Sequence, residues 1–173
     1  MYPLKLCSNN KNKLPESSSL DHTKVKAPYI REAGIIVVDD KNKIYKYDIR
    51  LIQPNSGLIP SPVLHSLEHL LAVTMRNYTG GIIDISPMGC QTGFYLITLN
   101  QSYKDVIDIF EKSLHDLLAF QEVPFANVIQ CGSAGYHDLL GAKKYAQIML
   151  DGKNNWAIGG KVCNNESNSV ELY

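Results

Sequence analysis

The residues of this chain best suited to chemistry are two histidines and a glutamate in the run His65-Ser-Leu-Glu68-His69. Residues four apart on a helix lie on neighbouring turns of one face. His65 and His69 can therefore hold one metal ion, with Glu68 beside them. A carboxylate next to a metal site can accept and donate protons. The alternative is a buried helix that merely carries these groups, but each polar group would then need a partner.

Two cysteines lie in glycine-punctuated segments of the folded middle of the chain. Cys90 lies in the run Pro87-Met-Gly-Cys-Gln-Thr-Gly93, and Cys131 is followed by Gly132. The other two, Cys7 and Cys163, lie in polar terminal segments, and this pattern does not resemble a disulfide framework. In a reducing compartment, thiols near a helical histidine pair are better interpreted as metal ligands or reactive groups.

The elements that position these residues follow from the hydrophobic pattern. β-branched and alternating segments predict strands, and apolar residues at helical spacing predict helices. The expected strands cover residues 35–38, 44–52, 82–86 and 94–99, and the expected helices cover residues 62–77, 102–120 and 139–151. The order β-β-α-β-β-α-α predicts an α+β fold, in which an antiparallel sheet packs against helices.

Three polar residues receive modest interpretations from the pattern alone. In the second strand, Arg50 lies opposite the apolar row, which indicates a face exposed to solvent. His22 follows Asp21 in what is interpreted as a local turn. His137 precedes the last helix and is interpreted as a capping or surface residue.

Length and charge limit the classes of protein to consider. A chain of 173 residues, 45% of them hydrophobic, suits one folded domain. Seventeen basic residues balance seventeen acidic ones, so there is no electrostatic case for nucleic acid or for a membrane surface. The N-terminal residues lack the apolar stretch of a signal peptide, and we expect a cytoplasmic protein.

We expect three segments along the chain. Residues 1–16, rich in Lys, Asn and Ser, are predicted to form a flexible arm, with regular structure beginning near Leu20. Residues 17–160 are predicted to form a single catalytic domain, and residues 161–173 to form a polar tail.

The motifs together, in this order, resemble the S-ribosylhomocysteine lyase (LuxS) family over residues 17–152. The joint signal is specific, although no single piece is. It comprises Leu20-Asp-His-Thr, Tyr47-Asp-Ile-Arg50, the run from His65 to His69, Asp84-Ile-Ser-Pro-Met-Gly-Cys-Gln-Thr-Gly93 and Cys131-Gly-Ser-Ala-Gly-Tyr-His-Asp138.

The resemblance implies a reaction, a cofactor and an assembly. The reaction is cleavage of S-ribosylhomocysteine to homocysteine and 4,5-dihydroxy-2,3-pentanedione, the precursor of autoinducer-2 in quorum sensing. The cofactor is one Fe2+ per subunit, with zinc or cobalt as substitutes, and the assembly is a homodimer with active sites at the subunit interface. By the same resemblance the metal ligands are His65, His69 and Cys131, the catalytic residues are Cys90 and Glu68, and the substrate-binding residues are Ser17, His22, Arg50 and Asp84.

This chemistry needs two bases. Two carbonyl migrations each move a proton between neighbouring carbons, and a β-elimination then expels the thiol. Cys90 is expected to shuttle protons at C1 and C2 of the sugar, and Glu68 is expected to take the C4 proton. A metal held by two neutral imidazoles and a thiolate keeps an open position and can stabilise the developing enediolate.

Two other functions remain open from the residues alone. His-x-x-Glu-His also occurs in metallopeptidases, which need a further downstream carboxylate, and Glu111 and Glu122 are the candidates before the tail. A closed structural zinc site could instead use His65, His69, Cys90 and Cys131, since four ligands fill a tetrahedron.

Overall fold

The computed structural model describes residues 15–160 of the chain. The predicted tail lies outside the described residues, as does all but the end of the predicted arm. The division into arm, domain and tail therefore stays a prediction. Within the described part, no helix is both long enough and apolar enough to cross a membrane.

Four antiparallel strands form one sheet in the order β1-β2-β4-β3. All four predicted strands are present, but the first begins earlier than the pattern indicated. Tyr29 and Ile30 are buried in it, and Tyr29 pairs with Arg50 on the neighbouring strand. The polar pair Arg31 and Glu32 interrupts the apolar run and concealed this half of the strand. The bounds are Tyr29–Val37 for β1, Lys43–Arg50 for β2, Ile82–Pro87 for β3 and Gly93–Leu99 for β4.

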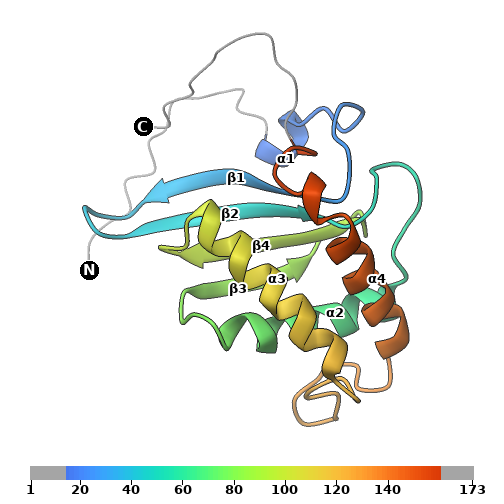
Figure 1. Ribbon diagram of the computed structural model, residues 1–173. Coiled ribbons are helices and arrows are strands. Elements are labelled where there is room, and N and C mark those ends of the chain that lie inside the picture. The colour runs from blue at the N-terminus through green and yellow to red at the C-terminus, as the bar shows by residue number, and fades with distance from the viewer. Residues whose placement is uncertain (1–14, 161–173) are drawn as a thin grey trace.

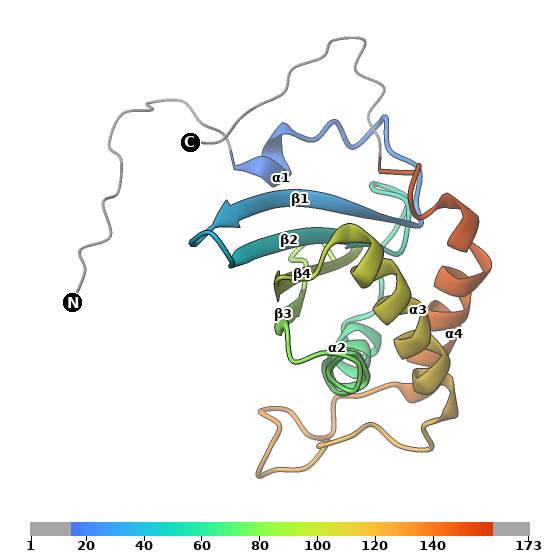
Figure 2. The ribbon, with the colours of Figure 1, turned by 60° about the vertical axis from the view of Figure 1, so that its left-hand side comes forward.

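Three long helices gather on one face of the sheet, so the predicted α+β architecture is confirmed (Figures 1 and 2). Leu67, Leu70 and Leu71 of the first of them join Ile49 and Phe94 of the sheet in one hydrophobic core. We call the opposite side of the sheet, which none of these three long helices covers, the helix-free face. The helices are α2 (Ser61–Arg76), α3 (Tyr103–Ala119) and α4 (Leu139–Asp151), and a short 3₁₀ turn, η1 (Lys153–Asn155), follows.

A short helix, α1 (Glu16–Ser19), precedes the point at which the sequence indicated that regular structure begins. A tertiary contact holds this helix in place: Glu16 forms an ion pair of 2.5 Å with Arg31 on β1. The polar composition of this segment gave no local signal for such a contact. The pairing places α1 against β1, at one edge of the sheet.

The interpretation of Arg50 as a solvent-exposed residue is wrong. Only 2% of Arg50 and 1% of Asp48 is exposed, and the guanidinium holds the carboxylate through two hydrogen bonds of 3.1 and 2.8 Å. Asp48 also accepts hydrogen bonds from Tyr29 and Arg31, its neighbours across the sheet on β1. Alternation in a strand identifies two faces, but it does not say which segments cover the polar one.

This network shifts the ionisation of its members. Burial acts to lower the pKa of Arg50, but the hydrogen bonds and the charge of Asp48 outweigh it and raise that pKa above its ordinary value. Burial, reinforced by the charge of Asp48, raises the pKa of Tyr29. The arginine is therefore a fixed cation within the fold.

Removing the carboxylate should destabilise the protein strongly. We expect Asp48→Ala to lower the free energy of unfolding by roughly 3–5 kcal/mol, because it leaves the Arg50 charge buried without its partner. Urea unfolding at one protein concentration measures this change. The matched control is Asp108→Ala, which breaks an exposed pair with Lys112 and should cost no more than about 0.5 kcal/mol. Equal effects of the two substitutions would contradict this account.

Candidate metal centre and active site

Helix α2 positions the two histidines and Glu68 together. Pro62 lies in its first turn, where a proline needs no intrahelical N–H bond. The leucines of the helix point into the core, whereas His65, Glu68 and His69 are half-buried on its other side. The 3.6-residue period thus delivers the predicted arrangement, with the two histidines one turn apart.

Hydrogen bonds to backbone carbonyls fix the tautomers of these histidines. His65 Nδ1 lies 2.8 Å from the carbonyl oxygen of Tyr136, and His69 Nδ1 lies 2.8 Å from that of Pro124. A carbonyl oxygen can only accept, so each Nδ1 must carry the hydrogen. Each Nε2 is left with a lone pair, which is the state of a metal-ligating histidine.

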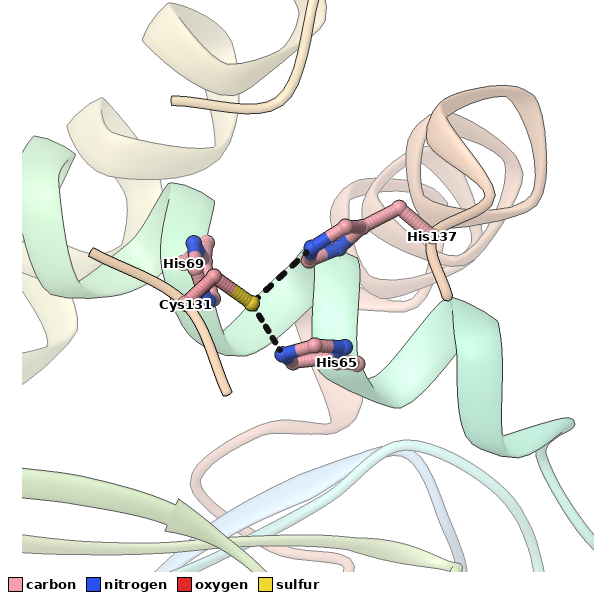
Figure 3. Close-up of side chains that lie close together, drawn as sticks. All are labelled: His65, His69, Cys131 and His137. Atoms are coloured by element: carbon pink, nitrogen blue, oxygen red, sulfur yellow. Dashed lines mark hydrogen bonds between the residues drawn. The ribbon is translucent and has the colours of Figure 1, made fainter. Parts of the chain in front are cut away.

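The third predicted ligand meets them from a loop more than sixty residues away. Cys131 is 9% exposed, and its Sγ lies 3.4 Å from His65 Nε2 (Figure 3). A cysteine sulfur and imidazole nitrogens without hydrogens are all electron-pair donors, and such a group can bind a cation. The donor set suits iron(II) or zinc, so the residues fit the metal that the resemblance implies.

His137 belongs to the same cluster, and its interpretation as a capping or surface residue is wrong. One ligand atom from each of His65, His69, Cys131 and His137 can be chosen so that all lie within 4.8 Å of one another. Asp138, not His137, caps α4, by accepting the backbone N–H of Gly141. Burial, followed by the charges of the neighbouring histidines, lowers the pKa of His137. A cysteine and a histidine six residues apart are only a weak sequence signal for a shared site.

Cys90 lies apart from this cluster, on the tight turn between β3 and β4. Its exposed Sγ is 3.7 Å from Arg50 Nη1 and 3.0 Å from Thr92 Oγ1. Thr92 Oγ1 accepts a hydrogen bond of 2.8 Å from Arg50 Nη1, so its own hydrogen is free to point at the sulfur. The buried pair of Arg50 and Asp48 therefore aims a cation at Cys90.

Glu68 lines two cavities. One, of about 350 Å³, is shared with His65 and with Met88 and Gly89 of the Cys90 turn. The larger one, of about 610 Å³, is bordered by His69, Phe125 and Gln130. The first is the better candidate for a substrate, because it extends from His65 to the turn that carries Cys90.

The remaining predicted substrate-binding residues are not gathered at this cluster. Ser17 lies on α1, and His22 follows it, with its Nδ1 2.9 Å from the Leu20 carbonyl oxygen. Helix α1 contacts β1, whereas α2 contacts β3 at the other edge of the sheet. Asp84 is exposed on β3 and accepts a hydrogen bond from Ser86.

The geometry bears on the two other functions as well. Glu111 forms an ion pair with Lys153, Glu122 is exposed, and neither joins the cluster of potential ligands among the described residues. The metallopeptidase interpretation is therefore not favoured. In residues 15–160, the fourth member of the cluster is His137 rather than Cys90, which differs from the closed zinc site considered from the sequence.

The chain is similar to known proteins over most of its length. The family profile described as S-Ribosylhomocysteinase (LuxS) matches residues 16–158. A protein of Halobacillus halophilus named S-ribosylhomocysteine lyase is 54% identical over 142 residues, which cover 82% of this chain and 93% of that protein. Proteins of the same name from Chromohalobacter salexigens and Staphylococcus aureus are each 52% identical, over 82% of this chain and over 92% and 91% of their own lengths. With a profile match across the whole described domain and relatives this similar, the chain belongs to the S-ribosylhomocysteinase (LuxS) family.

Proposed function

We propose that this chain is an S-ribosylhomocysteine lyase that uses Cys90 and Glu68 as its two bases. The enzyme cleaves S-ribosylhomocysteine to homocysteine and 4,5-dihydroxy-2,3-pentanedione. The observation that carries the proposal is the convergence of His65, His69 and Cys131 beside Glu68, in a chain half identical to proteins of that name. Release of homocysteine thiol from S-ribosylhomocysteine, with substrate in large excess, is its direct test.

His65, His69 and Cys131 would hold the metal, which the family resemblance gives as Fe2+. When bound, the metal supplies a Lewis acid that favours negative charge on the sugar oxygens. The protein's own contribution is to keep both Nε2 atoms free of hydrogen through the carbonyls of Tyr136 and Pro124.

Cys90 would move the protons of the two carbonyl migrations. As a thiolate it removes a proton from the carbon next to a carbonyl and, as a thiol, returns it to the neighbouring carbon. Arg50 and Thr92 both present hydrogens to Sγ and can stabilise the thiolate at each return to the basic state. Arg50 is fixed in this position, because its guanidinium donates two hydrogen bonds to Asp48.

Glu68 would remove the proton at C4, and the electron pair then expels homocysteine thiolate from C5. Its position suits this task, since it lies one residue from His69 and shares a cavity wall with His65 and the Cys90 turn. A carboxylate and a thiol on different elements can reach different carbons of one chain. This division explains why a single site can carry out three successive proton transfers.

A second copy of the chain would complete the site. The register of the sheet puts Ile36, Ile44, Ile97 and Leu99 together on the helix-free face, where Ile36 is 65% exposed and Leu99 is 37% exposed. Asp48 and Arg50 lie further along β2 on that same face. An apolar sheet face of this kind favours burial against a partner. The partner's α1 segment could then bring Ser17 and His22 to a substrate near Arg50.

The proposed cellular compartment follows from the two thiols on which the proposal depends. Cys90 and Cys131 are both free in the structure. A base and a ligand of this kind need a reducing environment, which supports the predicted cytoplasmic location.

Removal of the Cys90 thiol should lower activity without lowering metal content. We expect Cys90→Ala to lower the rate of homocysteine release by at least ~10²-fold, since a general base is removed, while the bound metal is retained. The paired variant, Cys131→Ala, should lose both metal and activity, because a ligand is removed. Elemental analysis and thiol release measure the two properties. A fully active Cys90→Ala protein would refute the role of Cys90, and unchanged metal in Cys131→Ala would refute that ligand.

Neutralising Glu68 should stop the reaction after the carbonyl migrations. In Glu68→Gln we expect thiol release to fall by roughly 10²–10⁴-fold while a ketone intermediate accumulates, because Cys90 remains able to move protons at C1 and C2. Carbon-13 NMR of labelled substrate detects the ketone. Asp116→Asn, on the exposed part of α3, is the control and should behave as the parent protein. Normal thiol release from Glu68→Gln would exclude Glu68 as the elimination base.

A charge on the apolar sheet face should separate the subunits. We expect Ile97→Glu to convert a dimer into monomers, because the desolvation of a carboxylate buried in the interface exceeds what its attraction to Lys46, opposite it on β2, can offset. Sedimentation velocity measures the mass. Leu140→Glu introduces the same charge on α4, where the leucine is 80% exposed, and should leave the dimer intact. A dimeric Ile97→Glu protein, or a monomeric parent, would contradict the assignment of this face.

A further inference from the structure

The segment that carries Ser17 and His22 has no anchor of its own in the hydrophobic core. Helix α1 lies beside β1 (Figure 2), is four residues long, contains no buried residue and has no side-chain hydrogen bond at its N-cap. The first buried residue in the described part of the chain is Val25, which follows both of them. So short a helix is not stable by itself in water. A contact with the rest of the protein must therefore hold these two residues in place.

That contact is the ion pair between Glu16 and Arg31. Arg31 Nη1 lies 2.5 Å from Glu16 Oε1, and the two side chains are only 33% and 19% exposed, the glutamate being the more exposed. Beside the pair lies a cavity of about 330 Å³ with mostly polar walls, among them Ser19 and Asp21. Apolar packing therefore contributes little to holding α1, and Ser17, the residue after Glu16, takes its position from this pair.

Arg31 is itself held from the other side by the buried carboxylate of Asp48. Its Nη2 lies 3.3 Å from Asp48 Oδ2, the same oxygen that accepts a hydrogen bond of 2.8 Å from Arg50 Nη2. The two nitrogens that hold Glu16 and Asp48 belong to one planar guanidinium, so their spacing is fixed. Burial acts to lower the pKa of Arg31, but the hydrogen bonds and charges of the two carboxylates outweigh it and raise that pKa. A permanent cation thus connects α1 to the sheet.

Acidic and basic side chains alternate from α1 to the turn that carries the proposed thiol base. The order is Glu16, Arg31, Asp48 and Arg50, and Arg50 Nη1 lies 3.7 Å from Cys90 Sγ. Asp48 divides its attraction between two guanidinium groups, so the loss of one leaves the carboxylate to the other. A change at Arg31 is therefore felt at both ends of this row.

We propose that Arg31 is a positioning residue for the reaction, which places Ser17 through Glu16 and sets the cation beside Cys90 through Asp48. The inference rests on the proposed function, in which Ser17 binds the substrate and Cys90 is a base. Arg31 acts through its two carboxylate partners rather than on the substrate itself. In a dimer each subunit carries the whole row, so one substitution acts on both sites.

The steady-state constants for homocysteine release test the end at α1. We expect Glu16→Gln to raise KM for S-ribosylhomocysteine at least about 5-fold with kcat within about twofold of the parent, because only the position of a substrate-binding residue changes. Glu111→Gln is the matched control, since Glu111 also forms an ion pair of 2.5 Å, with Lys153, and is 28% exposed. The control should keep both constants. A parental KM in Glu16→Gln would contradict the role of the pair.

The rate at which iodoacetamide modifies Cys90 tests the other end without turnover. In metal-loaded protein, followed by peptide mass spectrometry, we expect Arg31→Gln to slow this reaction at least about threefold, since the thiolate loses a nearby positive charge. Glu16→Gln removes a negative charge and should not slow it. A merely structural role would move KM and the modification rate together in both variants. A parental rate in Arg31→Gln would overturn the proposed link to Cys90.

Arg31→Lys separates the charge of this residue from its geometry. Lysine keeps the positive charge but lacks the planar fork that holds two carboxylates at once. We expect it to keep the modification rate of Cys90 within about twofold and to raise KM, so it tests the proposal even where Arg31→Gln fails to fold. Slowed modification in Arg31→Lys would refute the electrostatic link. If the parent protein releases no homocysteine, the proposed function fails instead, and the modification rates, which need no substrate, still decide whether Arg31 acts on Cys90.

Discussion

The hydrogen bonds from His65 and His69 to the carbonyl oxygens of Tyr136 and Pro124 determine what the site can be. They do two things at once. They force the hydrogen onto Nδ1, which leaves each Nε2 able to bind a metal, and they attach two points of the loop between α3 and α4 to the exposed side of α2. Cys131 lies between those two contacts along the chain, and its sulfur lies 3.4 Å from His65 Nε2.

A second fixed group is the buried pair of Asp48 and Arg50. Burying two charges gives little net stability, since desolvation offsets their attraction. Instead, the pair fixes the position of Arg50, because a guanidinium held by two hydrogen bonds can present its remaining N–H groups to Thr92 and Cys90. The sheet thus supplies the cation beside the thiol, and α2 supplies the carboxylate and the two histidines that are proposed as metal ligands.

Glu68 connects these two centres. It is attached to α2 with the histidines, yet it borders the cavity that reaches the Cys90 turn. The proposed chemistry requires two bases that act on different carbons, and Glu68 and Cys90 are carried by different elements. The residues of α1, by contrast, lie at the opposite edge of the sheet within one chain. Their part in the proposed site would therefore require a second copy, bound through the helix-free face.

The sequence by itself determined the features that depend on local periodicity. The 3.6-residue repeat put His65, Glu68 and His69 on one side of a helix whose leucines face the core, and β-branched and alternating segments identified the four strands, apart from the first half of β1. The order of the motifs also identified the family and hence the expected roles of Cys90 and Cys131. Tertiary structure alone decided the positions of side chains that depend on residues far away in the sequence. Arg50 is buried because Asp48, Tyr29 and Thr92 surround its guanidinium, and His137 faces the metal ligands because Ser66 holds the backbone beside it. Contacts between residues dozens of positions apart leave no periodic trace in the chain, so only the folded arrangement could show them.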